Sequence, residues 1–251
     1  MTERSALVVV GHNGPERYAV GPRRAAWWRE PDGFLFDEFE LAQRVAIVTA
    51  FELDARGWRV AVCSTPKAYP EHLYEKGRAL DQWRPSIGLA VHFNVFSRER
   101  DRRGGWPGAE SGVFGAGHVP VETDRASGTS VVVWDGSEPA RDFARIAVRK
   151  VDENTGLRLA LGDGIDERTI DGPDRVWILT RVQPGRRRKR FPTPGWDGCP
   201  VVVLEVAVLS HPRDRGIVRG DPHFFSKVGA AYGAACDEWL AAVRREEADA
   251  R

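Results

Sequence analysis

The segment VVVLEVAVL, residues 201–209, is the most strongly strand-like stretch of the sequence. Every residue in it except Glu205 is apolar, and most are β-branched. An unbroken run of this kind is typical of a strand that is buried on both faces of a parallel sheet. An ionised carboxylate is costly there unless it has a partner. Glu205 is therefore either a functional group, or it turns outward from an edge strand.

Two further apolar strands and their neighbours predict the type of sheet. ALVVV (6–10) ends in Gly-His-Asn-Gly, and LAVHFNVF (89–96) carries a histidine and an asparagine near its end. Between them lie a helical pattern over 37–56, a strand RVAVC (59–63) and a helix-like stretch over 71–83. This alternation predicts an α/β fold with a mostly parallel, twisted sheet flanked by helices.

The remaining chain fits the same domain. Helical spacing recurs over 138–151 and over 222–247, whereas about 97–126 and 183–198 are rich in Gly, Pro and Arg and have a loop-like pattern. We interpret the last two stretches as insertions. A chain of 251 residues can bury one substantial core, so we expect a single domain over 1–251.

Composition excludes several classes of function. The net charge of +1 gives no general attraction to nucleic acid, and no apolar run approaches the roughly 18 residues of a membrane span. We therefore expect neither nucleic-acid binding nor membrane insertion. The three cysteines are scattered, as expected for reduced thiols. The apolar stretch near the N-terminus is too short for a signal peptide, which predicts a cytoplasmic protein. Composition does not indicate an oligomeric state.

Polar residues at the ends of the predicted strands suggest a metal site. Functional groups of a parallel sheet collect beyond the carboxyl ends of its strands, where His12, His92 and Glu205 are expected. Glu38 opens a helix at the same edge. Two imidazoles and one carboxylate form a typical catalytic zinc site with an open fourth position, and a second carboxylate can serve as general base. Each histidine alone could simply be hydrogen-bonded, and Glu38 could balance the helix dipole.

The order of the motifs resembles a known family. Five segments occur in the order found in zinc-dependent N-acetylmuramoyl-L-alanine amidases, which are cell-wall and phage-lysin enzymes: VVVGHNG, DEFELAQRVA, LAVHFNVF, ASGTSVVVW and CPVVVLEVAVLSHPRD. The resemblance implies a phosphorylase/hydrolase-like fold and one zinc ion per chain, held by His12, Glu38 and His92. It implies that Glu205 is catalytic and that the lactyl–L-alanine bond of peptidoglycan or a muropeptide is cleaved.

The sequence also departs from the family pattern. Ala42 replaces the usual asparagine of the helix motif, and Ala207-Val208 replaces the usual Gly-Phe after the catalytic glutamate. The separation between the first histidine and Glu38 is long, which makes Asp37 a rival ligand.

Three alternatives therefore stay open at this point. The chain could be a zinc hydrolase of the same fold that acts on a small cytosolic N-acyl amino acid or peptide-like amide. It could be a binding module without metal. It could also be a phage lysin, which is released from the cytoplasm without an export signal. Asn94, near the end of its strand, and His118, in the first insertion, are candidate contacts to the substrate.

Overall fold

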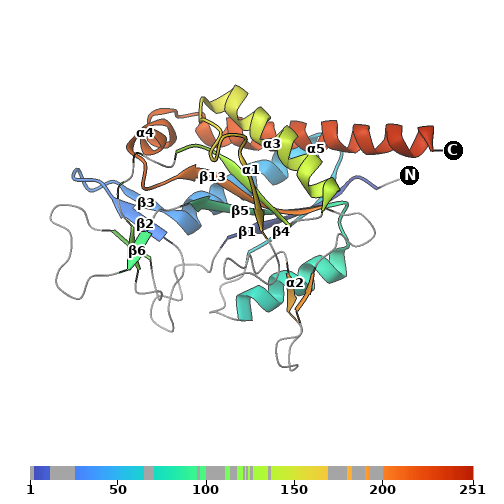
Figure 1. The fold of residues 1–251 in the computed structure, drawn as a ribbon, viewed down its shortest axis with the longest axis horizontal. Coiled ribbons are helices and arrows are strands. Elements are labelled where there is room, and N and C mark those ends of the chain that lie inside the picture. Colours follow the sequence, from blue (N-terminus) through green and yellow to red (C-terminus); the bar gives the residue numbers. More distant parts are fainter. Residues whose placement is uncertain are drawn as a thin grey trace.

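A computed structural model gives the fold of the chain (Figure 1). The structure describes residues 3–11, 26–64, 71–94, 97–99, 111–113, 118–120, 122, 124, 127–134, 137–168, 180–182, 190–192 and 200–250.

Five helices and thirteen strands lie in this part of the chain. The helices are α1 (Glu38–Ala55), α2 (Glu71–Trp83), α3 (Glu138–Thr155), α4 (Pro212–Gly220) and α5 (Phe224–Asp249). The strands are β1 (Ser5–Val10), β2 (Ala26–Arg29), β3 (Leu35–Asp37), β4 (Arg59–Cys63), β5 (Ile87–Asn94), β6 (Ser97–Glu99), β7 (Ser111–Val113), β8 (His118–Pro120), β9 (Ser130–Trp134), β10 (Ile165–Arg168), β11 (Thr180–Val182), β12 (Arg190–Pro192) and β13 (Val201–Val208). None of the helices described here is both long and apolar enough to cross a membrane.

One six-stranded sheet organises the domain, with the strand order β10-β9-β13-β5-β1-β4. Neighbouring strands are parallel except for the β13–β9 pair, which is antiparallel. Helices α1, α3 and α5 cover one face, and α2 lies on the other (Figure 1). The prediction of a single α/β domain with a mostly parallel sheet is confirmed. Since β13 lies inside the sheet, Glu205 is not on an edge strand.

The two faces of the sheet bury different sets of β13 side chains. Val202, Leu204 and Val206 belong to the large core beneath the three helices. Val201 and Val203 belong to a smaller cluster on the α2 face. Side chains alternate between the faces of a strand, which puts Glu205 on the α2 face.

The predicted insertions differ from the structure where it describes them. The stretch 97–126 was expected to be a loop, but it contributes three short strands, of which β7 pairs with β2 and β8 with β6. In 183–198 only β12 is described; it pairs with β11 and corrects the prediction of a pure loop there. Strands of three residues leave no recognisable periodicity in a sequence, which explains both errors.

A close contact between α1 and α5 leaves no room for a side chain at Gly229. A methyl group built on Gly229 would lie 2.7 Å from Val48 Cγ1 and 3.0 Å from the Val48 carbonyl carbon. Gly216 in α4 has open space around the same position. The glycine in α5 therefore sets the distance between the two helices.

We predict that Gly229→Ala lowers the free energy of unfolding by about 1–3 kcal/mol, because the helices must move apart. Gly216→Ala is the control and should stabilise the protein by about 0.5–1 kcal/mol through helix propensity alone. Urea unfolding of both variants measures the difference. A Gly229→Ala variant as stable as the control would contradict the close approach of α1 and α5.

Candidate metal and catalytic site

One row of residues crosses the α2 face at the carboxyl end of β5. Glu205 pairs with His92 of β5 on one side and with Ser130 of β9 on the other. On the far side of His92, the Gly11 amide donates a hydrogen bond to the Val91 carbonyl at 2.8 Å. A methyl group on Gly11 would lie 2.8 Å from the His92 ring, so the ring packs directly over this glycine. The sheet register therefore brings three predicted strand ends together.

Glu38 reaches this row from the first turn of α1. Its side chain is buried, and Oε1 lies 3.5 Å from Nδ1 of His92. The same oxygen accepts a hydrogen bond from the Phe93 amide at 3.3 Å. The backbone of β5 thus orients the carboxylate towards the imidazole.

Asp37, the rival ligand, has a different role in the structure. It is the N-cap of α1, where Oδ1 accepts hydrogen bonds from the amides of Phe39 at 3.0 Å and Glu40 at 3.2 Å. A capping aspartate satisfies amides that lack partners in the first helical turn. Of the two neighbouring acids, Glu38 is the one that faces His92.

The Glu38–His92 pair fits a zinc ion. Two donor atoms bound about 2.1 Å from a tetrahedral zinc lie about 3.4 Å apart, close to the observed 3.5 Å. His12, the third predicted ligand, lies outside the described residues and stays a prediction. Within the described residues alone, no three His, Cys, Asp or Glu side chains form a metal-binding group.

A β-bulge follows Glu205 directly. Glu205 pairs with His92, and the next pair is Val208 with Asn94, so two residues of β13 oppose one residue of β5. On the other side of the strand, the hydroxyl of Thr129 donates to the Glu205 carbonyl at 3.3 Å. Bulges bend a strand and redirect its side chains. Glu205 therefore occupies the last regular position of the central strand.

The two predicted substrate contacts have different outcomes. Asn94 ends β5, is exposed and lies two residues beyond His92, which places it on the same face of the sheet. His118 begins β8, where its backbone pairs with Glu99, but its side chain lies outside the described residues. Asn94 therefore lies at the edge of the site, and a substrate contact by His118 stays a prediction.

A buried lysine on the site face was not predicted. Lys76 of α2 is 2% exposed, and Leu80 on the next turn belongs to the apolar cluster of this face. Burial lowers the pKa of Lys76 to about 8, while the negative charges of Cys63 and Glu38 oppose this shift. In the sequence, Lys76 lies four residues before Leu80, so both side chains lie on the same side of the helix. This spacing could have indicated that Lys76 faces the apolar cluster.

We predict that Lys76 makes stability rise with pH. Below pH 8 the lysine is charged in both states; between pH 8 and about 10.5 only the unfolded chain keeps the proton, so folding becomes more favourable by up to about 3 kcal/mol. Lys76→Met should lose this rise, and Lys227→Met, at an exposed site, should keep it. Urea unfolding with a chelator present, from pH 7 to 10.5, measures the effect. Identical profiles for wild type and Lys76→Met would contradict the prediction.

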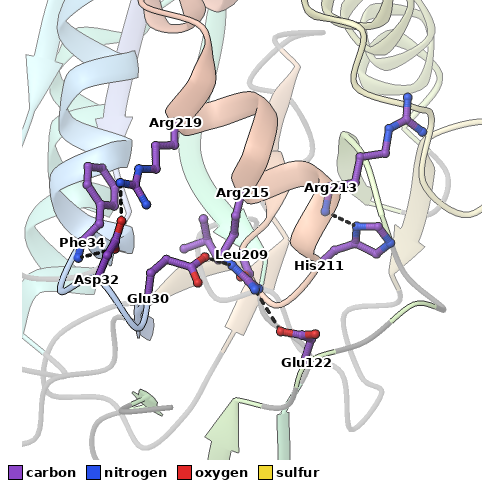
Figure 2. Close-up of polar contacts among 9 residues, drawn as sticks. All are labelled: Glu30, Asp32, Phe34, Glu122, Leu209, His211, Arg213, Arg215 and Arg219. Carbon is purple, nitrogen blue, oxygen red and sulfur yellow. Dashed lines mark hydrogen bonds and ion pairs between the residues drawn. The ribbon is translucent and has the colours of Figure 1, made fainter. Parts of the chain in front are cut away.

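Arg215 of α4 binds the β2–β3 hairpin, which leads into Glu38 (Figure 2). Its guanidinium is 5% exposed and donates to Glu30 Oε1 at 2.5 Å, to Glu122 Oε2 at 3.0 Å and to the Leu209 carbonyl at 3.0 Å. It also lies over the Trp28 ring, 4.2 Å from the ring centroid. A guanidinium suits this position because its planar fork can serve several acceptors at once.

One turn further along α4, Arg219 makes a second contact to the same hairpin. Its Nη2 lies 2.5 Å from Asp32 Oδ2, and the guanidinium lies over the Phe34 ring (Figure 2). The hairpin that leads into Glu38 is thus held against the helix that follows β13.

Comparisons with known proteins support the fold. No family model matches the sequence, and no curated protein sequence matches it. Among solved structures, the CwlD amidase of Clostridioides difficile, in complex with the GerS lipoprotein, is similar with a TM-score of 0.63 and 11% identity, over 96% of this chain and 100% of that one. The N-acetylmuramyl-L-alanine amidase Ami1 of Mycobacterium abscessus gives a TM-score of 0.62 at 14% identity, over 96% and 100%.

A phage enzyme extends this group of similar structures. The catalytic domain of the CD27L endolysin, which targets C. difficile, gives a TM-score of 0.55 at 12% identity, over 94% of this chain and 98% of that one. At these identities the similarity concerns the fold. The chain has the fold of N-acetylmuramoyl-L-alanine amidases.

Proposed function

We propose that the chain is a zinc-dependent amide hydrolase that cleaves the bond between N-acetylmuramic acid and L-alanine in peptidoglycan. One observation carries the proposal: the sheet register sets Glu205 beside His92, and Glu38 meets that same histidine at 3.5 Å. The fold supports the substrate class, because solved structures that share it are named as N-acetylmuramoyl-L-alanine amidases and as an endolysin.

His12, Glu38 and His92 would hold one zinc ion per chain. When bound, zinc polarises an amide carbonyl and makes a water molecule easier to deprotonate. Glu38 is prepared for this role because the Phe93 amide fixes one of its oxygens. The packing of the His92 ring over Gly11 fixes the plane of the imidazole.

Glu205 would act as general base and then as general acid. Its carboxylate takes a proton from the attacking water and gives it to the leaving amine, so no covalent intermediate with the protein forms. This role requires the carboxylate to lie about 2.6–3.2 Å from the water. The pairing of Glu205 with His92 in the sheet register supports this role.

We predict that Glu205→Gln binds zinc as wild type does but hydrolyses muropeptides about 10²–10⁴-fold more slowly, because only proton transfer is lost. Product analysis by chromatography and the zinc content after metal supplementation measure the two properties. Glu167→Gln, on the far strand β10, is the control and should behave as wild type. Full activity of Glu205→Gln would overturn the proposal. Hydrolysis of simple N-acyl amino acids but not muropeptides would favour a small-amide hydrolase.

A second pair of variants tests the metal ligands. Glu38→Gln should lose zinc, since it removes a charged donor, whereas Asp37→Asn should keep it, since asparagine also caps helices well. Zinc affinity by competition with a chromogenic chelator measures both. The opposite result would make Asp37 the ligand, and wild-type protein without stoichiometric zinc would indicate a binding module.

A further inference from the structure

Asp214 is a buried carboxylate that takes no part in the chemistry described so far. It lies in the first turn of α4 and is 1% exposed. Its Oδ1 accepts from the Ser127 hydroxyl at 2.6 Å, and its Oδ2 accepts from the amides of Gly128 at 2.6 Å and Val208 at 3.0 Å. A charged acceptor with three such donors is held firmly in one orientation.

These donors lie just beyond Glu205, where β13 ends and its antiparallel neighbour β9 begins. Val208 is the residue of β13 at which pairing with β5 resumes after the bulge. Gly128 comes two residues before Ser130, which is the partner of Glu205 in β9. Between them, Thr129 donates its hydroxyl to the Glu205 carbonyl. One carboxylate therefore joins the exit of β13 to the entry of β9, just beyond the Glu205–Ser130 pair.

The bulge explains why such an attachment is needed. The two residues of the bulge, Val206 and Ala207, both lie in the core beneath the three helices. A strand with an extra residue can shift its register, and a shift of one residue turns each side chain to the opposite face. The hydrogen bond from the Val208 amide to Asp214 fixes the position at which regular pairing begins again.

We propose that Asp214 is a positioning residue for Glu205, which it keeps on the site face by clamping β13 to β9 around the bulge. The functional part of this inference rests on the proposed role of Glu205 as general base. Asp214 itself faces the backbone and Ser127, not the site row. It acts only through the strand that carries Glu205.

The proposal predicts a specific kinetic defect. A displacement of about 1 Å in a catalytic group can cost about 10²-fold in rate. Asp214→Asn removes the negative charge and leaves one acceptor oxygen, where the carboxylate offers two oxygens to three donors. We expect its kcat to fall about 10–100-fold, with KM and zinc affinity within about twofold of wild type, because the zinc ligands lie on other elements.

Asp237→Asn is the matched control. Asp237 is likewise a hydrogen-bonded carboxylate, which accepts from Arg56 Nη1 at 3.1 Å and Trp58 Nε1 at 2.9 Å, but it joins α5 to the amino end of β4, away from the site. This variant should lose stability and keep kcat. Equal kcat values for Asp214→Asn and Asp237→Asn would overturn the proposal.

A second pair of variants, with smaller changes, tests the proposal if Asp214→Asn does not fold. Ser127→Ala removes one of the three donors and should lower kcat about two- to fivefold. Ser5→Ala, which removes a buried hydroxyl bonded to Ser86 at the amino end of the sheet, should leave kcat unchanged. No difference in kcat between these two variants would count against the clamp.

A readout without substrate separates the two proposals. If the wild-type protein hydrolyses no amide, the proposed function fails, yet hydrogen exchange still reports on the clamp. The amides of Gly128 and Val208 should exchange at least tenfold faster in Asp214→Asn or Ser127→Ala than in the matched controls. Unchanged exchange at both amides would overturn the positioning role, whatever the activity.

Discussion

The pairing of β13 with β5 places a carboxylate beside an imidazole in the middle of a buried sheet, and the site depends on this register. An acid in a central strand is costly unless it has polar neighbours. Here they come from adjacent strands, with His92 on one side and Ser130 on the other. The apolar residues before Glu205 hold the strand in place by packing on both faces of the sheet.

The short helix α4 connects the two halves of the site. Asp214 and Arg215 are neighbours in sequence but make contacts in different directions. Asp214 binds the strands around Glu205, whereas Arg215 binds the hairpin that runs into Glu38. Two adjacent charged residues of one helical turn thus connect the strand that carries the candidate general base to the hairpin that leads into a candidate metal ligand.

The long apolar strands and the amphipathic helices could be predicted because their periodicity is local. The run over 201–209 became β13, and the helix expected over 138–151 became α3. The choice between Asp37 and Glu38 could not be made from sequence, since both acids open the same helix and only the cap geometry distinguishes them. Lys76 and Asp214 were missed because burial of a charged residue depends on tertiary contacts. Helix α4 was not predicted, although His211 caps it and Pro212 suits its first position. His12 stays a prediction.

The position of β13 in the sheet also matters for how the protein is made. It is the central partner of β5 and β9, yet it follows every other strand of the main sheet along the chain. During synthesis on the ribosome, β5 and β9 leave the exit tunnel long before the strand that must lie between them. Such non-local pairing is slow, and unpaired strand edges promote aggregation. The main sheet is complete only after its last strand has been inserted, so a nascent or truncated chain lacks the strand that carries Glu205.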